Sequence, residues 1–142
     1  MVIVRDAKFD DFDELIPMFR SLFSRSDFSK SGQFDLTHAR RMFTVATATP
    51  NFFCQVVERN GRIVGCMGGV ITDTFWGDSI ATDVLMLSEV ASDRLIRNFK
   101  AWAKRRGAVA VQITNLYGSD RYDKLLNRLG VPSSGQVHLE IF

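Results

Sequence analysis

The sequence predicts a single α/β (α+β) domain over residues 1–142, with a mixed, mostly antiparallel sheet of about six strands flanked by about four helices. Three observations predict this class. Strand-like and helix-like patterns follow one another in the order β-α-α-β-β-β-α-β-α-β. An Asn60-Gly61 pair joins two β-prone runs, as in a tight hairpin. The runs 79–87 and 108–113 are almost continuously apolar, which is typical of strands covered on both faces.

The first predicted elements are one strand and two helices. Val2–Ala7 (VIVRDA) is rich in β-forming residues, and Asp10 or Asp11 can cap the helix that follows. The apolar residues of this helix recur at helical spacing: Phe12, Leu15, Ile16, Phe19, Leu22 and Phe23. A polar loop follows, and Asp35 or Thr37 then caps a second, weaker helix that runs to about Ala48.

The clearest local signal is the hairpin over residues 52–67. With a two-residue type I′ turn, Cys54 lies opposite Met67, and Cys66 lies opposite Gln55. Because neighbouring residues of a strand point to opposite faces, this register places the two thiols on opposite sides of the sheet as free cysteines. Glycines in the second arm predict a bulge or the close approach of another backbone: Gly65, Gly68 and Gly69.

The second half of the chain alternates strands and helices. A helix beginning near Ser92 follows the strand 79–87, and Gly107 ends it after two arginines. Its apolar stripe is expected in the core: Leu95, Phe99 and Trp102. A short helix covers Arg121–Leu129, and the strict alternation of Gln136–Ile141 predicts a last strand.

Composition and charge exclude several classes of protein. Hydrophobic residues make up 46% and charged residues 24%, and no run approaches the roughly 20 apolar residues of a membrane span. Arg5, Asp6 and Lys8 interrupt any signal-peptide pattern, and two cysteines do not indicate a disulfide-stapled secreted domain, so a cytoplasmic protein is expected. Neither His38 nor His138 has a partner at metal-binding spacing, so no metal is expected.

Positive charge is concentrated in one region. Residues 94–128 carry nine Lys and Arg but only two acidic residues, although the net charge of the chain is only +2. This basic run is either a solvated face or a surface for a phosphate, a nucleic acid or an acidic protein. No aromatic side chains interleave it as a stacking platform, so nucleic acid is not expected.

The order of elements resembles the GNAT superfamily, the acetyl-CoA-dependent N-acetyltransferases, over nearly the whole chain. Three runs are similar to family motifs: residues 57–65 to its hairpin, 99–108 to its central helix and 125–131 to its closing helix-Gly-aromatic motif. The compact form is similar to acetyltransferase-like proteins of bacteriophages. For such a protein, the host cytoplasm or the virion is the expected location.

The resemblance implies acetyl-CoA as the cofactor. In the family, a Q/R-x-x-G-x-G/A loop before the central helix holds the pyrophosphate on backbone N–H groups, and the pantetheine arm pairs with the edge of the preceding strand. Carried over to this chain, Asp83 is the candidate base, Tyr122 is the candidate acid, and Ser92 and Arg94 lie nearest the pyrophosphate. The strand residues expected along pantetheine are Val84, Leu85, Met86 and Leu87.

This chain departs from the family pattern at two places. Where the family has its V-x-P-x-x-R-G-x-G-x run, the chain has only Ser88 and Glu89, and we interpret the phosphate-binding loop as deleted. In the closing motif, Leu126 occupies the usual Tyr position, and Tyr122 lies one helical turn earlier. The Asn usually found before that Tyr corresponds to Ser119.

Several residues keep two interpretations. Asp83 is either a general base or a structural acid that bonds a neighbouring backbone group or an Arg. Ser88, Ser92 and Asp93 cap the central helix or mark a residual anion site. Tyr117 and Tyr122 either reach the site or pack in the core.

Two function classes follow. The first is an acyltransferase that binds acetyl-CoA abnormally; the second is a non-catalytic binding or structural module of the same fold, in a viral particle or against a host protein. A protein partner and a homo-oligomer both stay open.

Overall fold

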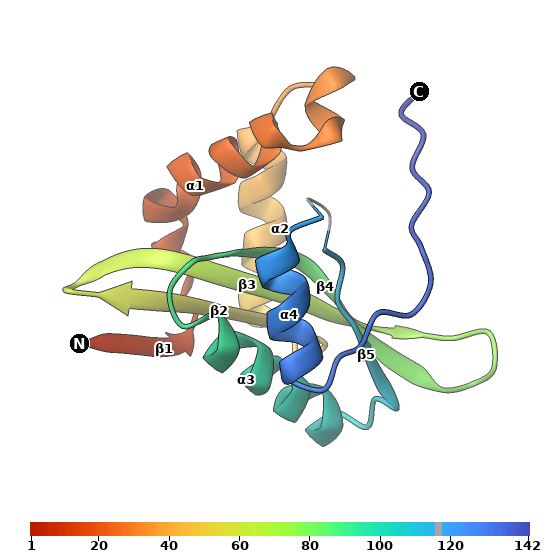
Figure 1. Cartoon of the computed structure of the whole chain (residues 1–142). Helices are drawn as coiled ribbons and strands as arrows, with labels where there is room; N and C mark the ends of the chain where they lie inside the picture. The colour runs from red at the N-terminus through yellow and green to blue at the C-terminus, as the bar shows by residue number, and fades with distance from the viewer. Residues whose placement is uncertain (116–117) are drawn as a thin grey trace.

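The computed structural model describes residues 1–115 and 118–142, and within them it contains five strands and four α-helices (Figure 1). Up to residue 128 their order is the predicted one. Two short 3-10 helices, Phe9–Asp11 and Asp27–Lys30, precede and follow the first α-helix. The elements are β1 (Val2–Asp6), α1 (Phe12–Arg25), α2 (Leu36–Ala48), β2 (Phe52–Arg59), β3 (Arg62–Asp73), β4 (Ser79–Ser88), α3 (Ser92–Arg105), β5 (Ala110–Gln112) and α4 (Asp120–Arg128).

The sheet has the order β1-β2-β3-β4-β5, and it is antiparallel except where β5 runs parallel to β4. Helices α1 and α2 cover one face, and α3 and α4 cover the other (Figure 1). This arrangement confirms the predicted α+β class with a mixed, mostly antiparallel sheet. The pairing of β4 with β5 extends only from Ile80 to Thr82, which decides where the candidate site lies.

Each face of the sheet has its own apolar core. Phe12, Leu15 and Phe19 of α1, which were predicted from helical spacing, pack together with Phe43 of α2 against β2 and β3, where they meet Val56, Ile63 and Cys66. The stripe of α3 packs against the other face: Leu95, Ile96, Phe99 and Ala103 with Phe53, Val57, Met67 and Ala81. Both helix pairs are therefore fixed to the sheet by apolar burial, the main favourable contribution to folding.

The hairpin turn is as predicted, but its register is not. Asn60 and Gly61 both have positive φ, at 54° and 76°, as a type I′ turn requires. Val64, the third residue after Gly61, is an extra residue in β3, because Val57 pairs with Gly65 while Glu58 pairs with Ile63. An inserted residue shifts the strand register by one, so each side chain beyond the bulge points to the opposite face of the sheet from the one predicted.

The prediction that the two thiols lie on opposite faces is therefore wrong. Val56 lies opposite Cys66, and Cys54 lies opposite Gly68, so both cysteines point to the α1–α2 face. Both are free in the structure, with Cys66 buried and Cys54 partly exposed.

Two further predictions about strands are wrong. No strand forms over residues 136–141; the segment after α4 instead runs beside the body of the protein as an extended tail (Figure 1). In addition, β5 is shorter than the predicted strand 108–113 and is half exposed, while β4 is only partly buried. Both differences follow from missing strand partners, since no described segment pairs with the outer edge of β5 and none pairs with this side of β4 beyond Thr82.

Candidate functional site: a groove at the open edge of β4

The candidate site begins where β4 separates from β5. Beyond Thr82 no described residue continues the ladder on this side of β4. On its other side β4 carries a bulge, because Gly68 pairs with Leu85 and Gly69 pairs with Asp83, which leaves Val84 without a partner. The bulge turns the strand locally, and Val84 is 59% exposed. A strand edge opened in this way has backbone N–H and C=O groups available to a ligand.

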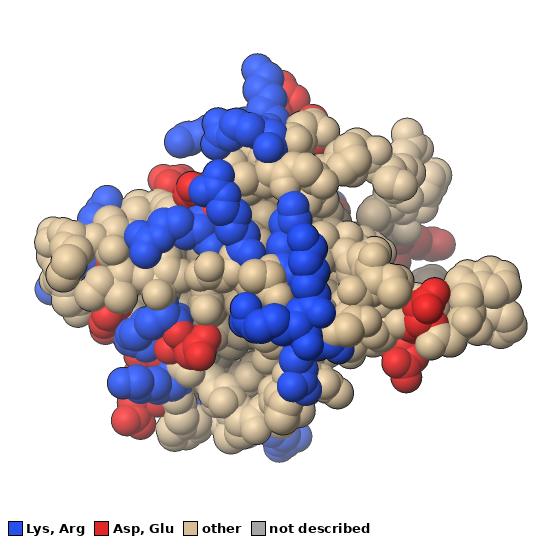
Figure 2. Space-filling model, turned by 90° about the horizontal axis from the view of Figure 1, so that it is seen from below, with Lys and Arg blue, Asp and Glu red and all other residues tan. Residues whose placement is uncertain are grey.

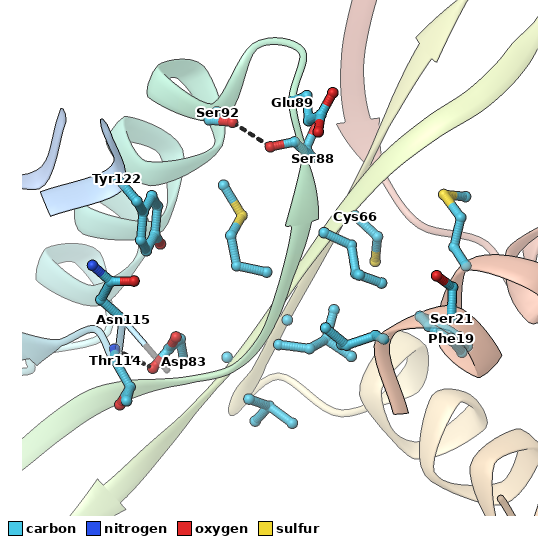
Figure 3. Close-up of a pocket in the computed structure, with 18 of the residues that line it drawn as sticks. Phe19, Ser21, Cys66, Asp83, Ser88, Glu89, Ser92, Thr114, Asn115 and Tyr122 are labelled. Atoms are coloured by element: carbon cyan, nitrogen blue, oxygen red, sulfur yellow. Dashed lines mark hydrogen bonds between the residues drawn. The ribbon is translucent and has the colours of Figure 1, made fainter. Parts of the chain in front are cut away.

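A groove of about 1850 Å³ passes on both sides of this part of β4. In Figure 3, β4 runs between two groups of lining side chains: Phe19, Ser21 and Cys66 lie on one side, and Asp83, Thr114, Asn115 and Tyr122 lie on the other. The four consecutive residues of β4 that were predicted to lie along pantetheine all line the groove: Val84, Leu85, Met86 and Leu87. The structure thus brings the predicted base, the predicted acid and the predicted strand edge together.

Asp83 is held at the point of strand separation. Its Oδ1 accepts a hydrogen bond from the backbone N–H of Thr114 at 3.1 Å, in place of a further ladder bond between β4 and β5. Burial removes water from the carboxylate and raises its pKa to about 6, even though the Thr114 hydrogen bond acts in the opposite direction. Part of the population is therefore protonated near pH 6, the behaviour expected of a carboxyl group that exchanges protons near neutrality.

Tyr122 faces the same space from α4 (Figure 3). Ser119, the N-cap residue of α4, accepts the Tyr122 backbone N–H at 3.2 Å and so fixes the first turn of the helix. The phenolic oxygen is buried and has no hydrogen-bond partner among the described residues. Burial and the nearby charge of Asp83 both raise the pKa of Tyr122, so its hydroxyl stays protonated and is available as a hydrogen-bond donor.

An unpaired buried hydroxyl costs free energy unless a ligand supplies the missing partner. Sequence reasoning placed Tyr122 only as a shifted substitute for the family Tyr. Its unpaired state depends on the surrounding fold and has no signal in the sequence. Tyr117, the other tyrosine considered, lies outside the described residues.

The junction between β4 and α3 is short and internally bonded. Only residues 89–91 separate the two elements, and α3 begins at Ser92 as predicted. The Ser88 hydroxyl donates to the Val90 carbonyl at 2.5 Å, and the Ser92 hydroxyl donates to the Ser88 carbonyl at 2.7 Å (Figure 3). The hydroxyls of Ser88 and Ser92, which the sequence analysis considered as part of a residual anion site, are therefore already hydrogen-bonded within the turn.

The N-cap of α3 is Ala91 rather than the predicted Ser or Asp. Ala91 has φ 56°, the left-handed region that non-glycine residues rarely adopt, and it makes no side-chain cap. Glu89 and Asp93 add negative charge on either side of it, which opposes an anionic ligand. Of the predicted cofactor contacts, Ser92 lines the groove, whereas Arg94 does not and instead donates to the Val2 carbonyl at 3.3 Å.

The basic residues of α3 and α4 form a broad surface rather than a pocket. Figure 2 shows Lys and Arg side chains gathered across the face seen from below, the side on which α3 lies in Figure 1. Several of them hold the fold together: Lys100 donates to the Leu129 carbonyl at 2.6 Å, Arg97 pairs with Asp93 at 3.2 Å, and Arg106 donates to Asn51 at 3.1 Å.

The far side of the groove is apolar, a feature that the sequence analysis did not assign to the site. Side chains of α1 and α2 line it, including Met18, Phe19, Leu22, Phe23, Met42 and Phe43. The sequence analysis placed Phe19, Leu22 and Phe23 on the apolar face of a helix, and the chain has 12 Phe against 2 Tyr, but both observations fit a hydrophobic core equally well. Within residues 1–115 and 118–142 no group of three or more His, Cys, Asp or Glu side chains is arranged to hold a metal. No helix in these ranges is both long enough and apolar enough to cross a bilayer.

Solved structures with the same fold include two acetyltransferases and a transcriptional regulator. The chain is similar to glucosamine-6-phosphate N-acetyltransferase from Arabidopsis thaliana, with a TM-score of 0.73 and 11% identity over 100% of this chain and 98% of that one. It is also similar to a transcriptional regulator from Bacillus halodurans, with a TM-score of 0.77 and 20% identity over 100% of both chains. No family model and no curated protein matches the sequence.

A third similar structure is an aminoglycoside acetyltransferase from an uncultured soil metagenomic sample, solved in complex with sisomicin. Its TM-score is 0.71, with 14% identity over 99% of this chain and 95% of that one. At these identities the likeness is one of fold. The chain therefore has the GNAT fold expected from its element order and motifs.

Proposed function

We propose that the protein is an acyltransferase of GNAT fold that transfers an acetyl group from acetyl-CoA to an amine, with weak affinity for the donor. The observation that carries the proposal is the meeting of Asp83 and Tyr122 at the opened edge of β4. A carboxylate with a pKa of about 6 and an unpaired buried hydroxyl face one space from two different elements. Burying a carboxylate or an unpaired hydroxyl in a hydrophobic core destabilises the fold, so the presence of both groups at one place favours a functional role.

The roles follow from the chemistry of thioester aminolysis. Asp83 accepts a proton from the acceptor amine, and the amine nitrogen forms a bond to the thioester carbonyl carbon. The carbon–sulfur bond breaks, and Tyr122 donates its phenolic proton to the departing thiolate. The products are an amide and a thiol, and the proton on Asp83 returns to Tyr122 directly or through water.

The two ends of the donor fit the groove unequally. The open edge of β4 from Val84 to Leu87 suits an extended pantetheine arm, because its unpaired backbone groups can hydrogen-bond the amides of that arm. The junction at Ser88 and Ser92 does not suit the pyrophosphate, because both hydroxyls are bonded within the turn and two acids flank it. The proposal therefore includes a donor held by its thioester end and bound weakly overall.

A transfer assay with acetyl-CoA and a panel of primary amines tests the proposal. Asp83→Asn should lower kcat by roughly 10²–10⁴ and Tyr122→Phe by roughly 10–10², since each removes one proton-transfer group. Asp78→Asn is the matched control, because Asp78 lies on the exposed β3–β4 loop and does not line the groove. Turnover that is unchanged in both site variants would refute the assigned roles.

A second candidate is a non-catalytic binding or structural module. The internally bonded β4–α3 junction favours it, because that junction leaves the phosphates of a CoA donor poorly held. A folded protein with no transfer to any amine at millimolar donor would support the module and overturn the enzyme.

A further inference from the structure

We propose that the tip of the β3–β4 hairpin binds the exposed face of α3 on a second copy of this chain. The tip is defined as residues 73–78, and the exposed face of α3 is defined by its four exposed basic residues, Arg94, Arg97, Lys104 and Arg105. None of these residues lines the groove, so the inference concerns other surfaces and does not depend on acyl transfer.

The tip holds two aromatic rings in water. Phe75 and Trp76 are 92% and 83% exposed, and their rings meet edge to face with centroids 5.1 Å apart. The turn that carries them is ordered, because the Thr74 N–H donates to the Asp78 carbonyl at 2.7 Å and the Thr74 hydroxyl accepts the Trp76 N–H at 3.2 Å. Aromatic side chains on a fixed turn lose little conformational entropy when a partner covers them, so the tip is suited to binding.

The tip is also acidic. Asp73 and Asp78 flank the two rings, both are exposed, and neither forms an ion pair with a described residue. No Lys or Arg occurs anywhere between Arg62 and Arg94 in the sequence. The hairpin extends away from the rest of the molecule (Figure 1), so its end combines two uncovered rings with two unpaired carboxylates.

The exposed face of α3 has the opposite charge. Its basic residues recur at helical spacing on the side of α3 that faces away from the core, and Figure 2 shows Lys and Arg side chains gathered on this side of the molecule. Arg97 is paired with Asp93 at 3.2 Å. Lys104 and Arg105 form no ion pair or side-chain hydrogen bond with a described residue, so their charges are available to a partner.

The two surfaces complement each other chemically. Carboxylates of the tip can pair with Lys104 and Arg105, and the face of an indole ring attracts ammonium and guanidinium groups. No large apolar side chain is exposed on α3, which disfavours a membrane or a mainly hydrophobic partner on this face. A nucleic acid would neutralise the bases but leave the aromatic tip in water. Because one chain carries both complementary surfaces, we assign the partner as a second copy.

Sedimentation of the full chain over a range of concentrations tests the proposal. A contact that buries less than about 1,200 Å² is weak, so the weight-average mass should rise above the 16.0 kDa of one chain only above about 50 µM. A dilute assay of the groove therefore measures the monomer. Trp76→Ala and Lys104→Glu should each weaken the association about fivefold or more, and so should about 0.5 M salt, because the contact depends on charge.

Two matched controls make the same chemical changes elsewhere. Phe9 is 49% exposed, and Arg41 is exposed on α2, on the other side of the sheet. Phe9→Ala and Arg41→Glu should leave the association unchanged. A monomer at every concentration, or an association that salt does not weaken, would overturn the proposal. Loss of association in Trp76→Ala but not in Lys104→Glu would place the tip on another surface and overturn the assigned face.

Mixing the two site variants tests the pairing itself. Trp76→Ala retains an intact α3 face, and Lys104→Glu retains an intact tip. An equimolar mixture should therefore associate more strongly than either variant alone, since one variant supplies the tip and the other supplies the face. A mixture with no more association than its two components would show that tip and face do not bind each other.

Discussion

Phe99 of α3 packs directly on the backbone of Gly69 in β3. A Cβ atom at Gly69 would lie 2.3 Å from Cε1 of Phe99 and 3.0 Å from the Thr82 carbonyl oxygen. The absence of a side chain here lets α3 lie close to the sheet beside the bulge that opens β4. The glycines of β3 were predicted to mark a bulge or the close approach of another backbone; bulges do lie beside them, and at Gly69 the nearest group is the Phe99 side chain.

Gly69→Ala should destabilise the protein by about 1–3 kcal/mol, because a buried ring or a strand must move to admit the methyl group. Urea unfolding followed by circular dichroism measures the change. Gly32→Ala is the control, since nothing lies within 4 Å of the added Cβ and the φ of Gly32 is not in the left-handed region. Equal stability of the two variants would show that the Phe99 contact is not tight.

The thiols should differ strongly in reactivity. A hydrogen bond with Cys54 and burial raise the pKa of Cys66, which is only 1% exposed. Cys54 is partly exposed and lines the groove. A chromogenic disulfide reagent should modify Cys54 in the native protein at least about 10² times faster than Cys66. Cys54→Ser should abolish the fast phase and Cys66→Ser should keep it. Two equal phases would contradict the difference in burial between the two thiols.

The sequence supported the element order because most signals were local. Asn60-Gly61 requires positive φ whatever surrounds it, and the start of α3 near Ser92 followed from a junction too short for a longer loop. Gly65, Gly68 and Gly69 indicated a bulge or a close approach in this region, and bulges lie beside them, but the inserted residues themselves, Val64 and Val84, look like any other β-branched strand residue. The predicted tail strand failed for another reason, since alternation shows that a segment can pair but not where its partner lies.

Part of the candidate site was also predictable from a local signal in the sequence. Asp83 stood out because a carboxylate within an apolar strand is costly, and the structure explains it by the Thr114 hydrogen bond and the opened edge. The unpaired state of Tyr122 and the apolar wall of α1 and α2 arise from tertiary packing. A single sequence does not reveal either of them.

Asp83→Asn should stabilise the protein at neutral pH. Because the pKa of Asp83 is raised from 3.8 to about 6, the folded state binds the proton more tightly than the unfolded state. The contribution of this group to stability is therefore greatest below about pH 4 and falls as the pH rises through 6. A shift of about two units sets a ceiling of about 3 kcal/mol, and partial exposure reduces the expected gain to about 1–2 kcal/mol.

Denaturant titrations of both proteins at pH 4.5 and pH 7.5 measure this gain. The variant should be more stable at pH 7.5, with a smaller difference at pH 4.5, since Asn can still accept the Thr114 N–H. Asp78→Asn, on the exposed loop, is the matched control variant for these titrations. If Asp83→Asn instead unfolds more easily at pH 7.5, the acid is structural and the carboxylate charge itself holds β4 in place.

The rate of acetyl transfer should fall at acidic pH. Asp83 accepts a proton only when it is ionised, so kcat/KM should fall about tenfold per pH unit below about pH 6. The Asp83→Asn variant should retain a low rate without this acid limb. A limb that persists unchanged in the variant would assign the titration to another group, and turnover that is flat from pH 5 to pH 8 would exclude Asp83 as the base.

Affinity for acetyl-CoA should be weak because the β4–α3 junction offers the pyrophosphate few hydrogen-bond donors. Hydrogen bonds from backbone N–H groups to a phosphate contribute about 1.5–3 kcal/mol each, so losing two or three costs on the order of 3–9 kcal/mol. An ordinary micromolar site is worth about 8 kcal/mol, and we therefore expect no saturable binding below about 100 µM. Arg94 and Arg97 recover little, because one donates to the Val2 carbonyl and the other pairs with Asp93.

Calorimetric titration at low salt measures this affinity under conditions that favour any basic contact. S-acetyl-pantetheine, which lacks the phosphates, is the matched ligand. It should bind within about threefold of acetyl-CoA if the phosphates add almost nothing, since a threefold change is only about 0.6 kcal/mol. A low-micromolar dissociation constant for acetyl-CoA, together with a loss of tenfold or more for S-acetyl-pantetheine, would show that the short junction does hold the pyrophosphate. In that case, backbone N–H groups at the start of α3 outweigh the nearby charges of Glu89 and Asp93, and the donor is bound in the ordinary way.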